Sequence, residues 1–510
     1  SGAAPEQPGA APGQPGAAPE QPGAAPAQAA WRVYPELTVR QTYTDNAFVG
    51  STPRRSDFVT QVTPQLLIDG RGPRLSGHLD YRPSALIHSK HSEGNDFINA
   101  LDAAGRLEAV ERIFFIEAGG NVHQHFISPF SPQPGDVTSE SPNRVEVRTF
   151  SVSPYLRSEL GRDFEYELRH RQIFTTSDNS TLGDFRTAQS SARLARAVRL
   201  FGWALEYDDT TTHREDVTVR ADQESRLLRG RLFFQPNENW RLSASGGREE
   251  NNFVLEQVER ESIYGAGVRW RPGPRTTADF EYEHRFFGPS RLARLAHRTR
   301  ATAWNIGYWR ETSTFQEQVL SLPPGNTAAL LDQIFMARIS DPAQRANAVR
   351  QFIQTTGTPE SLAGSLAFYT QRVFVRDGVD AAFAILGARN SITFTVFSAD
   401  NTRISADSAA VATEVFALTD RFKQRGFGIH ANHKLTANTI ASLTVSRVAT
   451  RQAQPADFES RNSYYNFTLH HPLSPKTAVF GGFAVTRFEP EDNDASQAAS
   501  TVFVGLNHRF

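Results

Sequence analysis

The chain has 510 residues, of which 39% are apolar and 21% are charged, and its net charge is −1. This balance excludes the strongly basic surface that nucleic-acid binding requires. The absence of cysteine excludes disulfides, thiolate metal sites, thiol nucleophiles and covalent haem attachment. No apolar run approaches the roughly 18 residues of a transmembrane helix, but low mean hydropathy is compatible with a β-barrel, whose apolar residues occupy alternate positions.

Residues 1–30 differ in composition from the rest of the chain. A heptapeptide of the type GAAPEQP repeats from Gly2 to Gln28. Ala, Pro, Gly and Gln bury too little surface to offset the entropy of ordering. We expect a disordered periplasmic tail with polyproline character, which acts either as a simple tether or as a docking segment for a periplasmic partner.

Alternation of apolar and polar residues begins at Trp31 and continues to Phe510. In Phe280-Glu-Tyr-Glu-His-Arg-Phe286, the aromatic and the charged residues fall on opposite faces, which predicts a strand. The runs reach the roughly 9–11 tilted residues that cross a bilayer. We therefore predict an all-β, transmembrane antiparallel β-barrel of about 22 strands, with about 20–24 acceptable. The expected strands span residues 31–44, 57–69, 74–88, 95–109, 112–127, 144–160, 162–176, 186–199, 201–214, 222–235, 238–254, 261–271, 275–287, 290–298, 300–314, 369–386, 390–403, 420–434, 437–451, 458–471, 476–489 and 497–510.

The connections between the expected strands alternate between short and long. Short connections such as Arg271-Pro-Gly-Pro274 have turn chemistry, whereas 128–143, 315–368 and 404–419 are long. Outer-membrane barrels have short periplasmic turns and long extracellular loops. With an even number of strands, both termini are then periplasmic. The C-terminal segment Val504-Gly-Leu-Asn-His-Arg-Phe510 resembles the terminal-strand signal of such barrels, although His508 replaces its usual aromatic residue.

The insertion 315–368 predicts two short helices. The first spans about Thr327–Ile339, and the second has Asp341 as its cap, Pro342 at its first position and its end before Gly357. Two interpretations stay open: an extracellular cap, or a loop that folds inward and constricts the lumen. A barrel of about 22 strands is too wide to be filled by its own wall side chains. The lumen is thus either an open aqueous passage or one that the insertion and neighbouring loops partly close.

Charged residues of both signs are expected on the lumen face. They either form cross-strand salt bridges that hold the wall in register or select a charged solute. Inward aromatic residues are candidates for stacking on sugar rings or for packing against a loop: Tyr155, Phe233, Trp309 and Tyr464. The candidate lumen-lining residues are Arg82, Glu117, Glu165, Glu167, Arg169, Arg171, Glu206, Arg229, Arg231, Arg269, Asp279, Glu281, Glu283 and Arg285.

Catalytic motifs are not found in the sequence, so we expect no enzyme, no cofactor and no resident metal. His123 and His125 share a strand face near Glu117, where a metal pair is one interpretation and polar lumen histidines are the other. Neighbouring carboxylates such as Glu281 and Glu283 lack a nearby nucleophile or base that would suggest hydrolysis.

Several strand and turn segments resemble a family of outer-membrane proteins associated with exosortase and PEP-CTERM protein-sorting loci. The resemblance extends from about Trp31 to Phe510 and carries no site residues. It implies a barrel with a role in exopolysaccharide export or extracellular matrix assembly. The segments are Gln41-Thr-Tyr-Thr-Asp-Asn46, Ser56-Asp-Phe-Val-Thr60 with Thr63-Pro64, Val147-Arg-Thr-Phe-Ser-Val-Ser-Pro-Tyr155, His297-Arg-Thr-Arg300, Phe368-Tyr-Thr-Gln-Arg372 and Gly387-Ala-Arg-Asn390.

Three functional hypotheses follow. The preferred one is a passive conduit for exopolysaccharide in the outer membrane, which works with a periplasmic polysaccharide-export or assembly partner through residues 1–30. The second is a structural barrel that anchors a periplasmic or cell-surface assembly. The third is a diffusion or uptake porin. The expected partners are outer-membrane lipids and a polysaccharide, and not nucleic acid.

Overall fold

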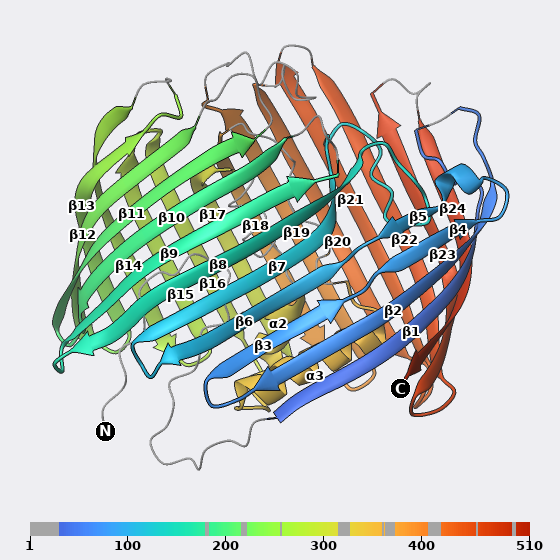
Figure 1. The fold of residues 1–510 in the computed structure, drawn as a ribbon, viewed down its shortest axis with the longest axis horizontal. Coiled ribbons are helices and arrows are strands. Elements are labelled where there is room, and N and C mark those ends of the chain that lie inside the picture. The colour runs from blue at the N-terminus through green and yellow to red at the C-terminus, as the bar shows by residue number, and fades with distance from the viewer. Residues whose placement is uncertain are drawn as a thin grey trace.

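The computed structural model describes residues 30–50, 52–178, 183–215, 222–254, 258–314, 327–359, 362, 373–405, 420–454, 457–491 and 496–510. The predicted tail, except Ala30, and the expected strand residues 369–372 lie outside the described residues. In the described part, each strand pairs antiparallel with its neighbours, and β1 pairs with β24 to close the sheet into a barrel (Figure 1). The predicted transmembrane β-barrel is confirmed.

The 24 labelled strands occupy 22 positions in the wall, because β3 with β4 and β5 with β6 are each two halves of one wall strand. Their bounds are β1 (Ala30–Thr44), β2 (Asp57–Arg71), β3 (Leu75–Tyr81), β4 (Ser84–His88), β5 (Asp96–Ile98), β6 (Leu101–Val110), β7 (Phe114–Phe126), β8 (Arg144–Leu160), β9 (Phe164–Ser177), β10 (Asp184–Arg196), β11 (Phe201–Glu215), β12 (Gln223–Asn237), β13 (Trp240–Asn251), β14 (Glu259–Gly273), β15 (Thr276–Arg285), β16 (Gly288–Arg298), β17 (Thr302–Ser313), β18 (Phe374–Leu386), β19 (Asn390–Arg403), β20 (Arg421–Lys434), β21 (Ile440–Gln454), β22 (Phe458–Pro472), β23 (Thr477–Pro490) and β24 (Gln497–Arg509).

Two expected strands are interrupted. The expected strand 74–88 breaks between β3 and β4 at Pro83, which has no N–H for the sheet. The expected strand 95–109 breaks between β5 and β6 at the same level of the wall. The backbone N–H of Arg82 donates to the carbonyl of Ala100 at 2.8 Å, so the two breaks remain joined.

The two rims of the barrel differ in their connections. The short-turn rim carries the brief links, such as 161–163 and 238–239. The long-loop rim carries the ends of the strands that long connections join, such as β7 and β8, β17 and β18, and β19 and β20. Strand β1 begins and β24 ends at the short-turn rim (Figure 1).

The outer surface of the wall is apolar. Large hydrophobic side chains are exposed there, such as Phe201 at 65%, Leu232 at 66% and Val502 at 61%. Polar side chains are instead buried on the inner side, which reverses the pattern of a water-soluble β-sandwich. Near the short-turn rim, Trp240 and Trp270 stack with ring centroids 5.8 Å apart. An apolar exterior with aromatic residues at the strand ends is the surface that outer-membrane barrels present to lipid.

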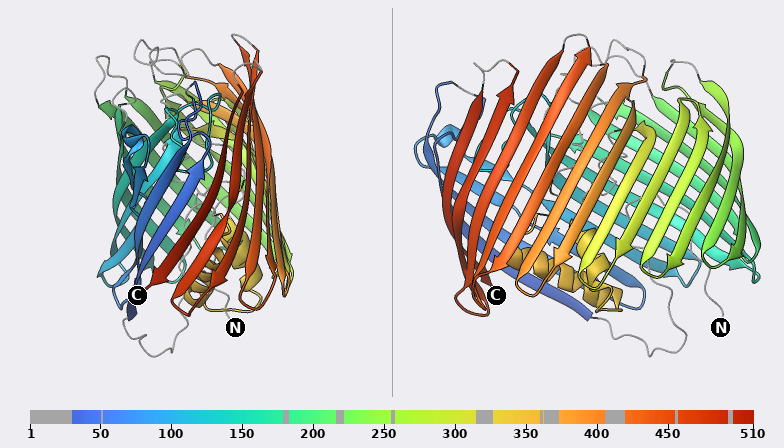
Figure 2. Two further views of the ribbon diagram at one scale, coloured as in Figure 1. Left: turned by 90° about the vertical axis from the view of Figure 1, so that its right-hand side faces the viewer. Right: turned by 180° about the vertical axis from the view of Figure 1, so that it is seen from behind.

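The barrel is flattened, and two helices lie inside it at the level of the short-turn rim (Figure 2). They are α2 (Thr327–Phe335) and α3 (Pro342–Thr356), while a short 3-10 helix, η1 (Ser92–Gly94), lies in the link between β4 and β5. Helix α3 begins and ends as expected: Asp341 accepts a hydrogen bond from the N–H of Gln344, and Gly357 is left-handed with φ 64°. Helix α2 ends at Phe335, earlier than the expected Ile339. Among the described helices, none is long and apolar enough to cross a membrane.

Candidate functional site

The candidate site is the lumen, whose inner face carries charged side chains in pairs. The two signs are interleaved around the wall rather than separated into acidic and basic zones. Of the candidate residues, Glu165 and Arg171 share the inner face of β9 with Arg169, while Leu168 is 48% exposed on the other face. Arg82 lies in the break between β3 and β4, with its Nε 3.4 Å from Asp80 Oδ1.

A first group of paired charges lies on β7, β8 and β9. Arg169 Nη1 is 2.6 Å from Glu117 Oε2, and its Nε is 3.0 Å from Glu167 Oε1. The Arg169 guanidinium lies 3.9 Å from the ring centroid of Tyr155, whose hydroxyl donates to Glu117 at 3.0 Å. The other face of Tyr155 stacks on Phe115. This group is a closed network that stabilises the register of three strands.

A second group spans the sharp bend of the flattened barrel, where β12, β13, β14 and β15 meet. Arg229 lies 2.8 Å from Glu206 on β11 and 3.2 Å from Glu283 on β15. Arg231 lies 3.4 Å from Glu206 and 2.7 Å from Glu281. The two pairs that reach β15, Arg229–Glu283 and Arg231–Glu281, cross the inner face of β13 and β14. We call this group the corner network. It also includes Arg285 with Glu249 on β13, at 2.5 Å, and lies beside the pair Arg269–Asp279.

Small residues on the inner face of β13 and β14 make the corner network possible. Gly247, Gly265 and Gly267 occupy the positions between the two charged rows, together with Ser245. A Cβ at Gly247 would lie 2.0 Å from the carbonyl oxygen of Leu228, and one at Gly265 would lie 2.3 Å from that of Tyr282. The inside of the bend therefore has no room for side chains there, and the long Arg and Glu side chains reach across it.

The segment 127–143 crosses the lumen from β7 and β8 to the opposite wall. Arg40 Nη2 on β1 is 2.5 Å from Asp136 Oδ2, and the N–H of Gln133 donates to Asn462 Oδ1 on β22 at 3.2 Å. Phe130 packs against Phe422 and Phe458 with ring centroids 6.3 and 5.9 Å apart. We call this segment the crossing loop. It constricts the lumen on the side of the long-loop rim.

Helices α2 and α3 close part of the lumen at the short-turn rim. Leu330 and Ile334 of α2 pack on Ala303, Ala384 and neighbouring wall residues of β17 and β18. This placement excludes an extracellular cap for the described helices and confirms the inward interpretation. The sequence does not reveal it, because α2 packs on the inner face of its own flanking strands β17 and β18, and the wall partners of α3, such as Asp69, are distant along the chain.

Helix α3 and the residues after it are held by polar contacts to the wall. Arg350 Nη2 lies 2.6 Å from Asp69 Oδ2. Asp69 is on β2, in the wall of the flattened barrel that lies opposite β17 and β18. Ser442 donates to the carbonyl of Thr356 at 2.7 Å, and Asn432 donates to Thr358 at 3.2 Å. Helix α2 is therefore fixed to the wall by apolar contacts, whereas α3 reaches the wall through a few polar groups and packs on the apolar cluster of α2 through Phe352.

The lumen wall away from these charged groups is rich in hydroxyl and amide side chains. Thr149 and Thr175 lie 3.4 Å apart through their hydroxyls, and Thr187 and Thr212 lie 3.0 Å apart. Among the described residues, no group of three or more His, Cys, Asp or Glu side chains is arranged to hold a metal ion, and this includes the surroundings of His123. Hydroxyl-lined surfaces of low net charge suit polar solutes that form hydrogen bonds.

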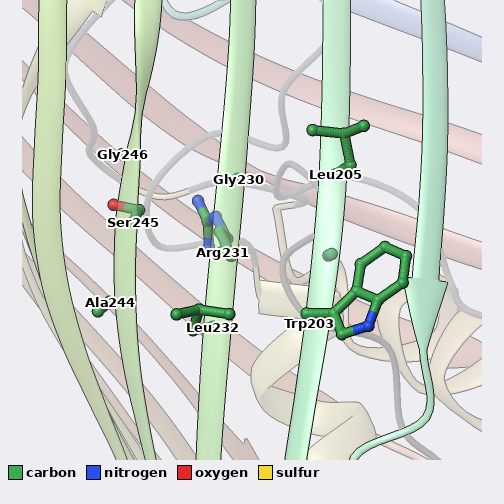
Figure 3. A pocket seen from close by; sticks show the side chains of 9 residues that line it. Trp203, Leu205, Gly230, Arg231, Leu232, Ala244, Ser245 and Gly246 are labelled. Atoms are coloured by element: carbon green, nitrogen blue, oxygen red, sulfur yellow. The ribbon is translucent and has the colours of Figure 1, made fainter.

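A shallow hollow of about 600 Å³ lies in the wall between β11, β12 and β13 (Figure 3). Leu205 and Leu232 border it on the lipid side, whereas Arg231 belongs to the inner face. The wall is thin at this place because Gly230 and Gly246 have no side chains. The hollow is a thin part of the wall rather than an enclosed ligand cavity.

The chain matches no known family model, and no curated protein matches it. Several solved structures share a similar arrangement of strands. A ferric enterobactin receptor (PfeA) mutant from Pseudomonas aeruginosa is 10% identical, with a TM-score of 0.45 over 94% of this chain and 80% of that one. The FrpB iron transporter from Neisseria meningitidis is 8% identical, with a TM-score of 0.44 over 94% and 82%. OccK2 (OpdF) from P. aeruginosa is 10% identical, with a TM-score of 0.35 over 94% and 97%. These likenesses are weak, and nothing about the solute of this chain follows from them.

Proposed function

We propose that this protein is a passive outer-membrane conduit whose lumen is closed, in the state described above, by helices α2 and α3 and is narrowed, but not closed, by the crossing loop. The observation that carries the proposal is the mode of closure. Two inserted segments cross a polar lumen, and α3 contacts the far wall through polar groups such as Arg350–Asp69, while its apolar contact, through Phe352, is with the cluster that holds α2. Such contacts exchange readily with water, so displacement of α3 costs far less than opening of the wall.

The cargo that we propose is an exopolysaccharide, in keeping with the resemblance described for the sequence. The hydroxyl-rich wall and the internal neutralisation of its charges favour an uncharged, hydrogen-bonding polymer over an ion. We place the short-turn rim and both termini in the periplasm. Residues 1–30 would then be positioned to bind a periplasmic export or assembly partner. No catalytic step is part of the proposal.

The test is single-channel conductance of the purified full chain in planar bilayers. We expect small, intermittent currents for the wild type and a large, stable conductance when a short Gly-Ser linker replaces residues 315–372. Arg350→Met removes the contact with Asp69 and should lengthen the open periods. Arg338→Met is the matched control, because Arg338 is an exposed arginine between the same two helices.

The outcomes separate the candidate functions. A stable current in the linker variant that falls when the polysaccharide is added supports the conduit. Absence of current in the linker variant, although the barrel is folded, would refute it and favour a structural barrel that anchors an assembly. An equal effect of Arg338→Met and Arg350→Met would show that the wall contact of α3 does not control opening.

A further inference from the structure

Tryptophan is used on both faces of the wall, but unequally. The chain has six tryptophans, and all of them lie in the described residues. Four are exposed on the lipid side, at 38–46%: Trp31, Trp240, Trp270 and Trp304. Trp203 also faces outward, because it alternates with the inward Ala204 and Glu206 on β11. Trp309 is thus the one tryptophan that faces the lumen.

Trp309 lies flat against the wall, and the neighbouring residues are suited to this orientation. Its partner in register on β18 is Gly378, and a Cβ there would lie 2.5 Å from the indole ring. The indole Nε1 donates to Asp380 Oδ1 at 3.0 Å. A Cβ at Gly307 would lie 2.7 Å from the same Asp380 oxygen. Two glycines therefore make room for an indole ring and for the carboxylate at its edge.

The charges around the indole are balanced. The carbon at the centre of the Arg376 guanidinium lies 4.8 Å from the ring centroid, and Asp380 binds the ring nitrogen. Because Arg376 lies over the ring, the exposed part of the indole offers an apolar face, with the carboxylate of Asp380 as an acceptor at its edge and the guanidinium as a donor. Pyranose rings have this combination of an apolar C–H face and a rim of hydroxyls.

The position of Trp309 places it next to the helices that close the lumen. Asn305, two inward positions earlier on β17, accepts a hydrogen bond from Gln333 of α2 at 3.1 Å. Four residues of strand separate Asn305 from Trp309, which is about 13 Å at about 3.3 Å per residue. A polymer that reaches α2 through the lumen along this wall would pass the indole.

Two of the three other inward aromatic side chains predicted from the sequence are buried, and the third lies against the crossing loop. Tyr155 is 3% exposed between Phe115 and Arg169. Phe233 is 5% exposed and packs against Ala204 and Ala195. Tyr464 lies against Gly135 of the crossing loop, where a Cβ would be 2.5 Å from its ring. Trp309 remains partly exposed, as does Tyr464, whose ring faces the crossing loop.

We propose that Trp309, Asp380 and Arg376 form a subsite for one residue of an uncharged oligosaccharide. The sugar ring packs its C–H face on the indole, while Asp380 accepts from its hydroxyls and Arg376 donates to them. The inference rests on the proposed conduit and deepens it, because it names the class of cargo and the place where the wall recognises it.

The experiment is calorimetric titration of the purified full chain in detergent with maltohexaose and cellohexaose, two neutral probes, and with a hyaluronan hexasaccharide as a charged one. We expect weak, saturable binding of at least one neutral probe and no tighter binding of the charged one. Trp309→Ala should lower the affinity by about tenfold or more, as expected when an aromatic contact at the centre of a site is removed. Asp380→Asn should lower it less, because an amide still accepts one hydrogen bond.

Trp304→Phe is the matched control, since Trp304 is on the same strand but faces lipid, and it should leave binding unchanged. Intrinsic fluorescence provides a second measurement: any sugar-dependent change in the wild type should vanish in Trp309→Phe and persist in Trp304→Phe. Absence of saturable binding, tighter binding of the charged probe, or equal affinity in Trp309→Ala would each overturn the subsite. The same preparations are measured for conductance, so that failure of the subsite with intact conductance of the linker variant is distinguished from failure of the conduit itself.

Discussion

At the scale of single residues, the contact between Arg40 and Asp136 connects the crossing loop to the wall. Burial alone would raise the pKa of the Asp136 carboxyl, but Arg40 and the N–H and hydroxyl of Thr138 outweigh burial and hold this pKa below its ordinary value of 3.8. A carboxyl group whose pKa is lowered in the bound loop favours that state above the ordinary pKa. The contribution is lost only as the pH falls through the lowered pKa.

The direction of this pKa shift predicts how the crossing loop responds to pH in the wild type and in two variants. The chain has no cysteine, so a spin label at Ser131→Cys reports the mobility of the crossing loop alone. We expect an immobile label from neutral pH down to about the ordinary carboxyl pKa, with release only below it. Arg40→Met leaves Asp136 buried without its counter-charge, at a cost on the order of 3 kcal/mol at neutral pH. The pKa of Asp136 should then rise, so that this variant binds the loop at acidic pH and releases it as the pH increases.

Asp136→Asn serves as the comparison for Arg40→Met, because it removes the titrating group itself. The mobility of its label should not change over the pH range in which the labels of the wild type and of Arg40→Met change. A wild-type label that becomes mobile between neutral pH and the ordinary carboxyl range would contradict the assignment of Asp136 as the group that holds the loop.

At the scale of elements, helix α3 depends on its two ends. The Asp341 side chain accepts from the N–H of Gln344 at 2.7 Å, and Gly357 closes the C-terminal end in the left-handed region. Asp341→Ala should destabilise α3 by about 1 kcal/mol, which corresponds to about fivefold faster amide exchange if α3 opens locally. Hydrogen exchange measured by mass spectrometry checks this. Gln344→Ala keeps the same N–H and should leave exchange nearly unchanged, and equal acceleration in both variants would contradict the cap.

The strands and the caps of α3 could be predicted from the sequence because their signals are local. Alternation assigns faces residue by residue, and Asp341, Pro342 and Gly357 mark the limits of a helix on their own. Pro83 was also a local signal for the break in the wall, but alternation on both sides concealed it. The destination of α2 and α3 was not predictable in this way. The wall partners of α3, such as Asp69 and Ser442, are on strands far away along the chain, and the strands that flank α2 reveal its position only once their inner face is known.

The candidate site was predictable only in its outline. Alternation placed the charged residues on the inner face, yet it could not identify which charges meet. Arg229 and Glu283 are 54 positions apart and are joined only because the wall bends sharply between them. Trp309 was one of several aromatic residues that alternation placed on the inner face. The role of Gly378, which makes room for the indole ring, can be recognised only when the register of β17 and β18 is known.

At the scale of the whole molecule, the flattened cross-section depends on the absence of side chains at Gly247, Gly265 and Gly267 on the inner side of the bend. Gly265 on β14 is the most direct test, because an added Cβ would lie 2.3 Å from the carbonyl oxygen of Tyr282 and 2.8 Å from the hydroxyl of Ser245. The backbone cannot yield there without separating β14 from β15. Separation would also lengthen the distance that Arg229 spans to reach Glu283.

We therefore expect Gly265→Ala to destabilise the barrel by about 1–3 kcal/mol, the usual cost of overpacking. Folded barrels resist SDS until heated, so the temperature at which the folded band disappears on a gel measures the effect. Gly273→Ala on the same strand is the control, because a Cβ there meets nothing within 4 Å. If the bend sets the shape of the lumen, Gly265→Ala in the linker variant should also alter the open-state conductance, whereas Gly273→Ala should not. Equal unfolding temperatures for the two variants would mean that the bend accommodates a side chain and that the corner network does not require the glycines.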